Sequence, residues 1–254
     1  MTTRAQQAAD EIRQQGYTVF EDACGPAEVD FIRNRLATRY AELGSPTTFA
    51  RPPLEPAPDV EISVVGLVFH QLGKHCGDIA PYLLNPEVIA ATRAVLGEDM
   101  FLEYTAAIVN NGSRPFFPWH MHVGGVDNLV YRKQGLFPTF TRSERITMLL
   151  YLDDLTPDAG ELLVYPRHLE DPTRPPFDPN DEHWEGQVEL ACRRGTVVLA
   201  EQNMWHAARP KRSEGLRSFV ACYFTASYAK ETSWRDESWR PHVGSSELLR
   251  SVVE

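Results

Sequence analysis

The segment Phe116-Phe117-Pro118-Trp119-His120-Met121-His122-Val123-Gly124-Gly125 carries two histidines separated by a single residue. Side chains alternate between the two faces of a β-strand, so both imidazoles of an extended segment point the same way. A third histidine from a distant strand would close a metal site, and Trp205-His206 supplies a candidate. This stretch therefore predicts a β-rich fold built around a metal centre.

The chain after residue 100 has the pattern of a β-rich core, because short runs of β-forming residues are separated by Gly, Pro, Asn and Asp. The expected strands cover roughly 101–109, 117–123, 145–152, 161–165, 187–191, 196–200, 205–209 and 216–225. Short strands in this number after a helical segment are typical of a sandwich, a jelly roll or a small barrel. We therefore expect a mainly β fold with flanking helices.

The first hundred residues are expected to be mostly helical. Apolar residues at helical spacing predict helices over 3–16, 26–43 and 86–96, which end at Gly16, Gly44 and Gly97. Extended segments are expected at 17–20 and 60–71, and the proline-rich residues 45–59 are expected to form a loop. The simplest organisation is one domain over 1–254, with a helical part over about 1–100 and a jelly-roll or barrel core over about 101–227.

Composition argues against several classes of partner. The formal net charge of -10 disfavours nucleic acid and anionic membranes, which both attract basic surfaces. No apolar run approaches the length of a membrane span, and the first residues lack the apolar core of a secretion signal. The four cysteines are scattered, with no C-x-x-C spacing, so we expect free thiols in a reducing, cytoplasmic compartment.

The histidines point to one kind of metal chemistry. Two histidines and one carboxylate on one side of the metal, with the other side open, are the ligand set of non-haem iron oxygenases. His120 and His206 would supply the two nitrogen ligands. The position that should carry the carboxylate is occupied by His122.

Much of the chain resembles the phytanoyl-CoA dioxygenase family of iron(II)/2-oxoglutarate oxygenases. Trp119-His120-Met121-His122 is similar to the family's W-H-x-D, and Trp205-His206 followed by Arg217 is similar to its distal H-x(9–11)-R element. Between them, 148–162 resembles the family's strand, acidic turn and return strand, and 164–168 resembles its V-x-P-G-S-H motif. The N-terminal segments agree as well, so the resemblance covers about residues 7–227.

The resemblance implies a double-stranded β-helix, which is a cupin-like jelly roll with the metal in its mouth. It implies Fe(II) as the metal, 2-oxoglutarate and dioxygen as co-substrates, and a small-molecule substrate that is hydroxylated, desaturated or cyclised. His120 and His206 become iron ligands, and Arg217 becomes the clamp for the distal carboxylate of 2-oxoglutarate. Arg217 also fits this role by itself, because it begins a strand whose inward face is mostly apolar, and a buried guanidinium needs an anionic partner.

The third iron ligand stays open between three alternatives. With His122 as the ligand, the site has three neutral nitrogen donors and one positive charge more than the usual version, which changes its redox tuning. Asp127 is a second possibility, since a carboxylate five residues further on would replace the missing one. In the third alternative neither binds, and a water completes the coordination.

Further residues are expected around the site. Thr147, Tyr104 and Asn110 are candidates for contacts with 2-oxoglutarate. The early loops that cover the mouth in this fold carry Arg51, His70 and His75 as candidate substrate contacts. We expect packing roles for Trp119 and Trp205, and surface positions for His168, His183 and His242.

The leading functional hypothesis is an iron(II)/2-oxoglutarate-dependent dioxygenase that oxidises a small metabolite, as a monomer or homodimer. A three-histidine iron oxygenase without 2-oxoglutarate is the first alternative, with a substrate that chelates the metal itself. A non-catalytic small-molecule-binding relative is the second, if the loss of the carboxylate marks a degenerate site.

Overall fold

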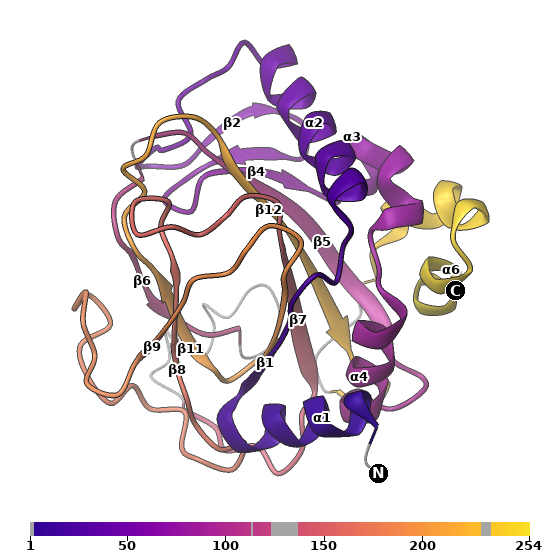
Figure 1. The fold of residues 1–254 in the computed structure, drawn as a ribbon, viewed down its shortest axis with the longest axis vertical. Coiled ribbons are helices and arrows are strands. Elements are labelled where there is room, and N and C mark those ends of the chain that lie inside the picture. The colour runs from indigo at the N-terminus through magenta and orange to yellow at the C-terminus, as the bar shows by residue number, and fades with distance from the viewer. Residues whose placement is uncertain (1–2, 113, 123–136, 230–234) are drawn as a thin grey trace.

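The fold consists of two antiparallel β-sheets that face each other, with helices on the outside of the larger one (Figure 1). The computed structural model describes residues 3–112, 114–122, 137–229 and 235–254. Within these residues the larger sheet has eight strands and the smaller sheet has four. This is the double-stranded β-helix that the sequence predicts.

The larger sheet has the strand order β1-β10-β7-β12-β5-β4-β3-β2. Its strands are β1 (Tyr17–Phe20), β2 (Leu54–Ala57), β3 (Val60–Ile62), β4 (Leu67–His70), β5 (Phe101–Asn110), β7 (Arg145–Tyr151), β10 (Val197–Glu201) and β12 (Arg217–Thr225). The smaller sheet has the order β6-β11-β8-β9, with β6 (Phe117–His120), β8 (Leu162–Tyr165), β9 (Val188–Leu190) and β11 (Trp205–Ala208).

The helices cover the outer face of the larger sheet. They are α1 (Arg4–Gln15), α2 (Pro26–Glu42), α3 (Gly73–Cys76), η1 (Gly77–Tyr82), α4 (Pro86–Leu96), η2 (Glu237–Ser245) and α6 (Glu247–Val253). Their apolar faces join one large core with the outward side chains of the central strands, for example Ile12, Leu36 and Val88 with Leu150 and Val220. None of these helices is long and apolar enough to cross a membrane.

A second core fills the space between the two sheets. Ala106, Leu149 and Ala221 from the larger sheet pack here with Leu162 and Val164 from the smaller one. Side chains alternate between the two faces of each strand, so the residues of β5, β7 and β12 that do not face the helices face this interior. Polar side chains at the inward-facing positions of these strands therefore lie in the space between the two sheets.

The predicted elements agree with the structure in most places. Helix α4 covers 86–96 as expected, and each strand predicted after residue 100 is present, with ends that shift by a few residues. The extended segments expected at 17–20 and 60–71 are confirmed as β1 and as the pair β3 and β4. One expectation is wrong, because residues 45–59 are not all loop and contain β2 at 54–57, at one edge of the larger sheet.

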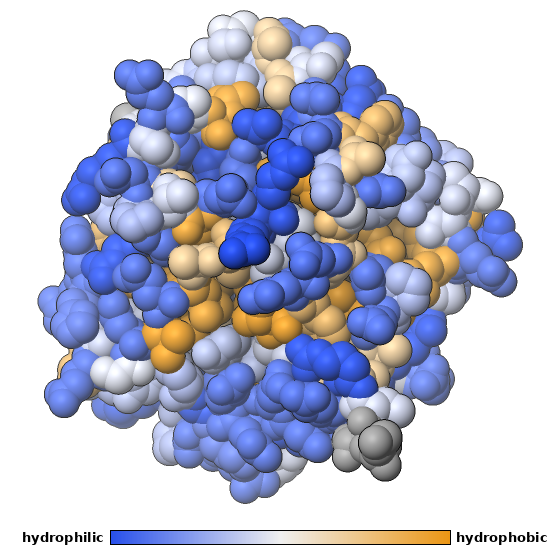
Figure 2. All heavy atoms as spheres, in the orientation of Figure 1, coloured by the Kyte–Doolittle hydropathy of each residue, from blue (hydrophilic) through white to orange (hydrophobic). Residues whose placement is uncertain are grey.

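The C-terminal segment is a feature that the sequence did not reveal. Residues 237–253 form η2 and α6, which pack against α3, η1 and β5. In Figure 1 this segment, coloured yellow, lies on the side of the molecule away from the smaller sheet. Polar residues cover most of the face seen in Figure 2, with hydrophobic residues near its centre.

Candidate metal and co-substrate site

Three histidines meet at one end of the interior. His120 ends β6 and lies opposite His206 of β11 in the antiparallel register. One ligand atom each from His120, His122 and His206 can be chosen so that all three lie within 4.8 Å of one another. The ring centroids of His120 and His206 are 4.0 Å apart, and that of His122 is 5.0 Å from His206. This spacing fits three nitrogen ligands around one metal ion.

The orientation of two of the rings is fixed by backbone carbonyls. The Nδ1 atom of His120 lies 2.9 Å from the carbonyl oxygen of Pro118, and that of His206 lies 3.1 Å from the carbonyl oxygen of Met204. Metal-binding histidines commonly have one ring nitrogen held in this way, which fixes the tautomer and aims the other nitrogen at the metal.

His122 joins the cluster from beyond the end of β6. The strand expected over 117–123 ends at His120, and the backbone N–H of His122 donates to the carbonyl of Gln202 at 2.8 Å. Its side-chain Nδ1 is buried and has no hydrogen-bond partner within the described residues. Asp127, the alternative third ligand, lies outside the residues that the structure describes.

Burial keeps the imidazoles of His122 and His206 neutral. It lowers the pKa of His122 to about 3, with a smaller contribution from neighbouring His206, and it lowers the pKa of His206 to about 4. A neutral imidazole is the form that binds a metal ion. The His122 and His206 rings are thus in the ligand form at neutral pH, before any ion arrives.

Arg217 lies in the same interior, at the first position of β12. It is 4% exposed, and its guanidinium carbon is 5.2 Å from the ring centroid of Phe219 and 5.7 Å from that of Tyr151. Asn110 lies opposite it in the register with β5 and is fully buried. Both polar atoms of the Asn110 amide and the Nε of Arg217 lack a partner within the described residues. The Arg217 Nε–H and the Asn110 Nδ2–H are unpartnered donors beside a buried cation, and they fit the carboxylate of a bound ligand.

Asp153 holds the start of β12 in place. Its Oδ2 accepts hydrogen bonds from the backbone N–H of Ser218 at 2.7 Å and from the Ser218 hydroxyl at 3.0 Å. Its Oδ1 forms an ion pair with Arg33 of α2 at 2.7 Å. Because Asp153 is committed to these partners, it fixes the backbone beside Arg217 while leaving that guanidinium for another anion.

Thr147 and Tyr104 also face the interior. Both lie opposite Tyr223 in the register, Thr147 from β7 and Tyr104 from β5. The Tyr223 ring bridges to the metal cluster, with its centroid 5.2 Å from His122 and 5.7 Å from Tyr104. The structure therefore brings together the seven residues proposed from the sequence on the inner surface, whereas their contacts with a metal or co-substrate stay predictions.

A cavity of about 730 Å³ opens beyond Tyr104. Its lining includes the carboxylates of Glu55, Asp59 and Glu61 from the β2–β3 hairpin, together with His70, which hydrogen-bonds to the Tyr104 hydroxyl. Two ring contacts thus connect the cavity to His122 through Tyr104 and Tyr223.

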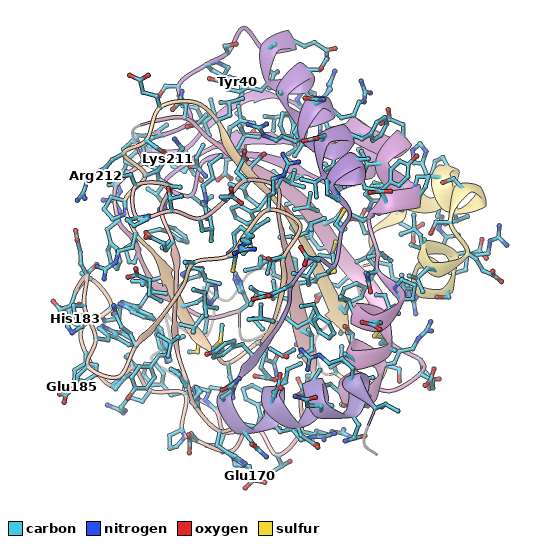
Figure 3. All side chains as sticks on the ribbon, in the orientation of Figure 1. Tyr40, Glu170, His183, Glu185, Lys211 and Arg212 are labelled. Carbon is cyan, nitrogen blue, oxygen red and sulfur yellow. The ribbon has the colours of Figure 1, made fainter. Side chains whose placement is uncertain are left out.

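The other sequence candidates are distributed as follows. Trp119 and Trp205 are packing residues as predicted, because they belong to an apolar cluster in which Trp119 stacks on Trp184. His168 and His183 are exposed, and Figure 3 labels His183 at the periphery. His242 is half-buried beside Trp239. Neither Arg51 nor His75 is part of the cavity lining.

Three buried polar residues near the site were missed by sequence reasoning. They are Arg114, Gln202 and Lys211, and all are at most 2% exposed. Arg114 and Lys211 lie in loops between strands, where no periodicity distinguishes a buried cation from a solvated one. Gln202 follows β10, and its backbone contact with His122 depends on long-range packing.

Comparison with known proteins decides the family. The sequence profile of the phytanoyl-CoA dioxygenase (PhyH) family matches residues 12–219. The chain belongs to this family. Phytanoyl-CoA dioxygenase family members are iron(II)/2-oxoglutarate-dependent oxygenases, so the protein is an oxidoreductase with iron(II) as its metal and 2-oxoglutarate as its co-substrate. A search of curated protein sequences found no match.

Several solved structures share the fold of this PhyH-family chain. HygX from Streptomyces hygroscopicus, with nickel and 2-oxoglutarate bound, is 16% identical with a TM-score of 0.60, over 91% of this chain and 90% of HygX. EctD from S. alaskensis, with 2-oxoglutarate and 5-hydroxyectoine, is 18% identical with a TM-score of 0.63, over 89% and 78%. The carbocyclase SnoK from nogalamycin biosynthesis is 17% identical with a TM-score of 0.63, over 98% and 93%.

Proposed function

We propose that this protein oxidises a C–H bond of a small metabolite, with iron(II) bound by His120, His122 and His206. The observation that carries the proposal is the convergence of three imidazoles, each with a ligand nitrogen within 4.8 Å of the other two, and two of the rings are oriented by backbone carbonyls. Three protein ligands leave coordination positions for a chelating co-substrate and dioxygen. We also propose a cytoplasmic location, since all four cysteines are free thiols.

The residues around the metal position have separate tasks in this proposal. Dioxygen is the oxidant: bound iron(II) would activate it, 2-oxoglutarate would supply two of the four electrons that reduce it, and the substrate would supply the other two. Arg217 holds the distal carboxylate of 2-oxoglutarate, and its burial strengthens the ion pair because little water competes. The Asn110 Nδ2–H donates to the same carboxylate, which satisfies that otherwise unpaired donor. Thr147 and Tyr104 position the co-substrate from the neighbouring strands.

The cavity beyond Tyr104 is our proposed entry for the substrate. Three carboxylates in its lining, on a protein with a net charge of -10, repel anionic groups. A coenzyme A thioester carries several phosphate charges and therefore fits this cavity poorly. We propose a neutral or cationic metabolite in place of an acyl-CoA.

An anaerobic titration tests the metal and co-substrate assignment. Adding 2-oxoglutarate to the iron(II)-loaded protein should produce a weak visible charge-transfer band. We expect His120→Ala to abolish the band and Arg217→Ala to weaken it, whereas His183→Ala, at an exposed position, should leave it unchanged.

Two results would contradict the proposal in different ways. Oxygen uptake with a chelating substrate, but no band with 2-oxoglutarate, would favour a three-histidine iron oxygenase that does not use this co-substrate. The presence of His122 in place of a carboxylate is the observation that favours this second function. A wild-type protein that binds no iron(II) would favour a non-catalytic binding protein.

A further inference from the structure

The sheet alone holds β6, the strand that ends in His120, only weakly. Within the described residues β6 lies at the edge of the smaller sheet, and its register with β11 is irregular between His206 and Ala208. Pro118 lies inside the strand and has no N–H to donate. A short edge strand of this kind needs support from outside the sheet to hold a metal ligand in place.

Residues 178–184, in the connection between β8 and β9, supply this support along the edge of β6. The backbone N–H of Trp119 donates to the carbonyl of Pro179 at 3.0 Å, and the Trp119 indole N–H donates to the carbonyl of Asp181 at 3.0 Å. Figure 3 labels His183 of this segment at the periphery, on the side where Figure 1 shows the smaller sheet. The residue before His120 is thus bonded to the segment through both its main chain and its side chain.

The Trp184 side chain fixes the segment against the sheet. Its ring stacks on Trp119, with ring centroids 4.3 Å apart and an angle of 12° between the planes. Its indole N–H donates to the carbonyl of Asp178 at 2.9 Å, and its ring centroid is 5.6 Å from that of Trp205. Trp184 is fully buried. It therefore contacts the residue that precedes a proposed metal ligand on each of two strands, β6 and β11.

The segment also has local hydrogen bonds that make it stiff. The Oδ1 atom of Asp178 accepts from the backbone N–H and from the side-chain amide of Asn180, both at 2.9 Å. The backbone N–H of Asp181 donates to the carbonyl of Asp178 at 3.0 Å, and that of Trp184 donates to the side chain of Gln187 at 2.8 Å. Such turns restrict the backbone, so the segment can act as a rigid support.

Strand geometry connects this support to the ligands. Because side chains alternate along a strand, Trp119 and Trp205 face away from the interior that His120 and His206 face. The carbonyls that orient the two imidazoles belong to the same chain segments as the histidines, so they set the ring angle and not the separation between the strands. Packing on the outer face, where Trp184 contacts both strands, acts on that separation.

We propose that Trp184 is a positioning residue for the metal centre, because it sets the separation between His120 and His206 from the outer face of the smaller sheet. This inference rests on the proposed function, since it takes these two histidines as metal ligands. Trp184 acts through Trp119 and Trp205 and has no direct contact with the metal in this proposal.

Cobalt(II) binding to the metal-free full-length chain tests the inference. The dissociation constant and the visible absorption band, which reports the geometry of the ligands, are measured for the wild type, Trp184→Leu and Trp184→Phe. Trp239→Leu is the matched control, because Trp239 is also fully buried and donates through its indole N–H, but to Thr105 in another part of the molecule. Urea unfolding of each metal-free protein is measured alongside.

We expect Trp184→Leu to bind cobalt(II) about tenfold to a hundredfold more weakly, the range for groups that support metal ligands, and to shift the visible band. Trp184→Phe keeps the stacked ring and loses the bond to the Asp178 carbonyl, so its affinity should fall by only about twofold to fivefold. Trp239→Leu should also unfold at a lower urea concentration, but its cobalt(II) affinity should stay within about twofold of the wild type, with an unchanged band.

Each other outcome has a distinct meaning. Wild-type cobalt(II) affinity in Trp184→Leu would overturn the inference, and so would an equal loss in Trp239→Leu, which would make affinity a matter of general stability. If Trp184→Leu does not fold, Trp184→Phe decides, and wild-type affinity there overturns the inference. His120→Ala separates the two proposals: undiminished binding in that variant would refute the metal assignment itself, and the inference with it.

Discussion

His122 is the residue at which this chain departs from the iron-binding pattern of its family. In the proposed ligand set, a histidine in place of a carboxylate removes one negative charge, so the ion and its ligands together have one more net positive charge. The ring is buried, and burial holds its pKa near 3. The position is therefore suited to a neutral donor and would be costly for an unpaired carboxylate before metal binding.

Substitution of His122 tests whether it is the third ligand. We expect His122→Ala to lower iron(II) affinity by at least roughly tenfold, because even neighbours of metal ligands have effects of that size. His122→Asp should still bind iron(II) and should turn over 2-oxoglutarate, because it restores the ligand set of two histidines and one carboxylate. The measurement is anaerobic metal titration followed by oxygen uptake. Wild-type iron affinity in His122→Ala would assign the third position to another group.

Single residues of the site differed in how far the sequence predicted them. The sequence predicts a partner for His120 on a distant strand, which is His206, and it predicts Arg217 at the start of an apolar strand. It also predicts that strand alternation aligns His120 with His122, but β6 ends at His120. Arg114 and Lys211 have no such signal, because a cation in a loop is solvated by default. Their burial results from loops that fold over the barrel end, which no local pattern specifies.

At the scale of elements, the end of β10 contains a buried acid whose titration affects stability. Burial raises the pKa of Glu201 to about 8. In the unfolded chain the same carboxyl titrates near its ordinary value of 4.5, so between these values the folded state holds a proton that the unfolded state has lost. The contribution of Glu201 to stability therefore falls as the pH rises from about 4.5 to about 8.

Glu201→Gln should remove this pH dependence. The amide oxygen of glutamine can still accept the hydrogen bond that Glu201 takes from the backbone N–H of Asn203. We expect the unfolding free energy of the wild type to decrease relative to the variant by up to about 1.4 kcal/mol per pH unit in this window. Urea unfolding between pH 5 and 8 measures the difference. Glu185→Gln, at an exposed position, is the control, and parallel pH profiles for all three proteins would refute the assignment.

The sequence predicts a helix or strand where apolar side chains recur at regular spacing, and it does not predict one where a proline interrupts that spacing. The strands after residue 100 alternate clearly, and the structure confirms them. β2 was missed because it contains Pro56, and proline is tolerated in a sheet only at an edge such as the one β2 forms. η2 was missed for a related reason, since Pro241 lies inside it.

At the scale of the whole molecule, Thr105 connects the C-terminal segment to the larger sheet. Its hydroxyl oxygen accepts from the indole N–H of Trp239 at 2.9 Å and from the backbone N–H of Leu72 at 3.2 Å. The hydroxyl donates to the carboxylate of Asp236 at 2.5 Å. Thr105 is fully buried, so water cannot replace these bonds.

Thr105→Val should destabilise the protein by about 2–4 kcal/mol, because it leaves buried donors and a buried carboxylate without their partner. Chemical denaturation measures the change. Thr38→Val is the matched control, since the Thr38 hydroxyl bonds only the Asn34 carbonyl on an exposed helix face, and its effect should stay within about 0.5 kcal/mol. A loss for Thr105→Val no larger than that of the control would mean that the C-terminal segment is anchored elsewhere.

The pairing of His120 with His206 across β6 and β11 also sets an order of events in the life of the protein. Within the residues that the structure describes, β6 is an edge strand that pairs with β11, which is made much later during synthesis. The His120–His206 pair therefore forms only after β11 has been synthesised and has paired with β6. In the proposed site, iron(II) links this edge strand to its neighbour, so metal binding should stabilise the β6 edge of the smaller sheet.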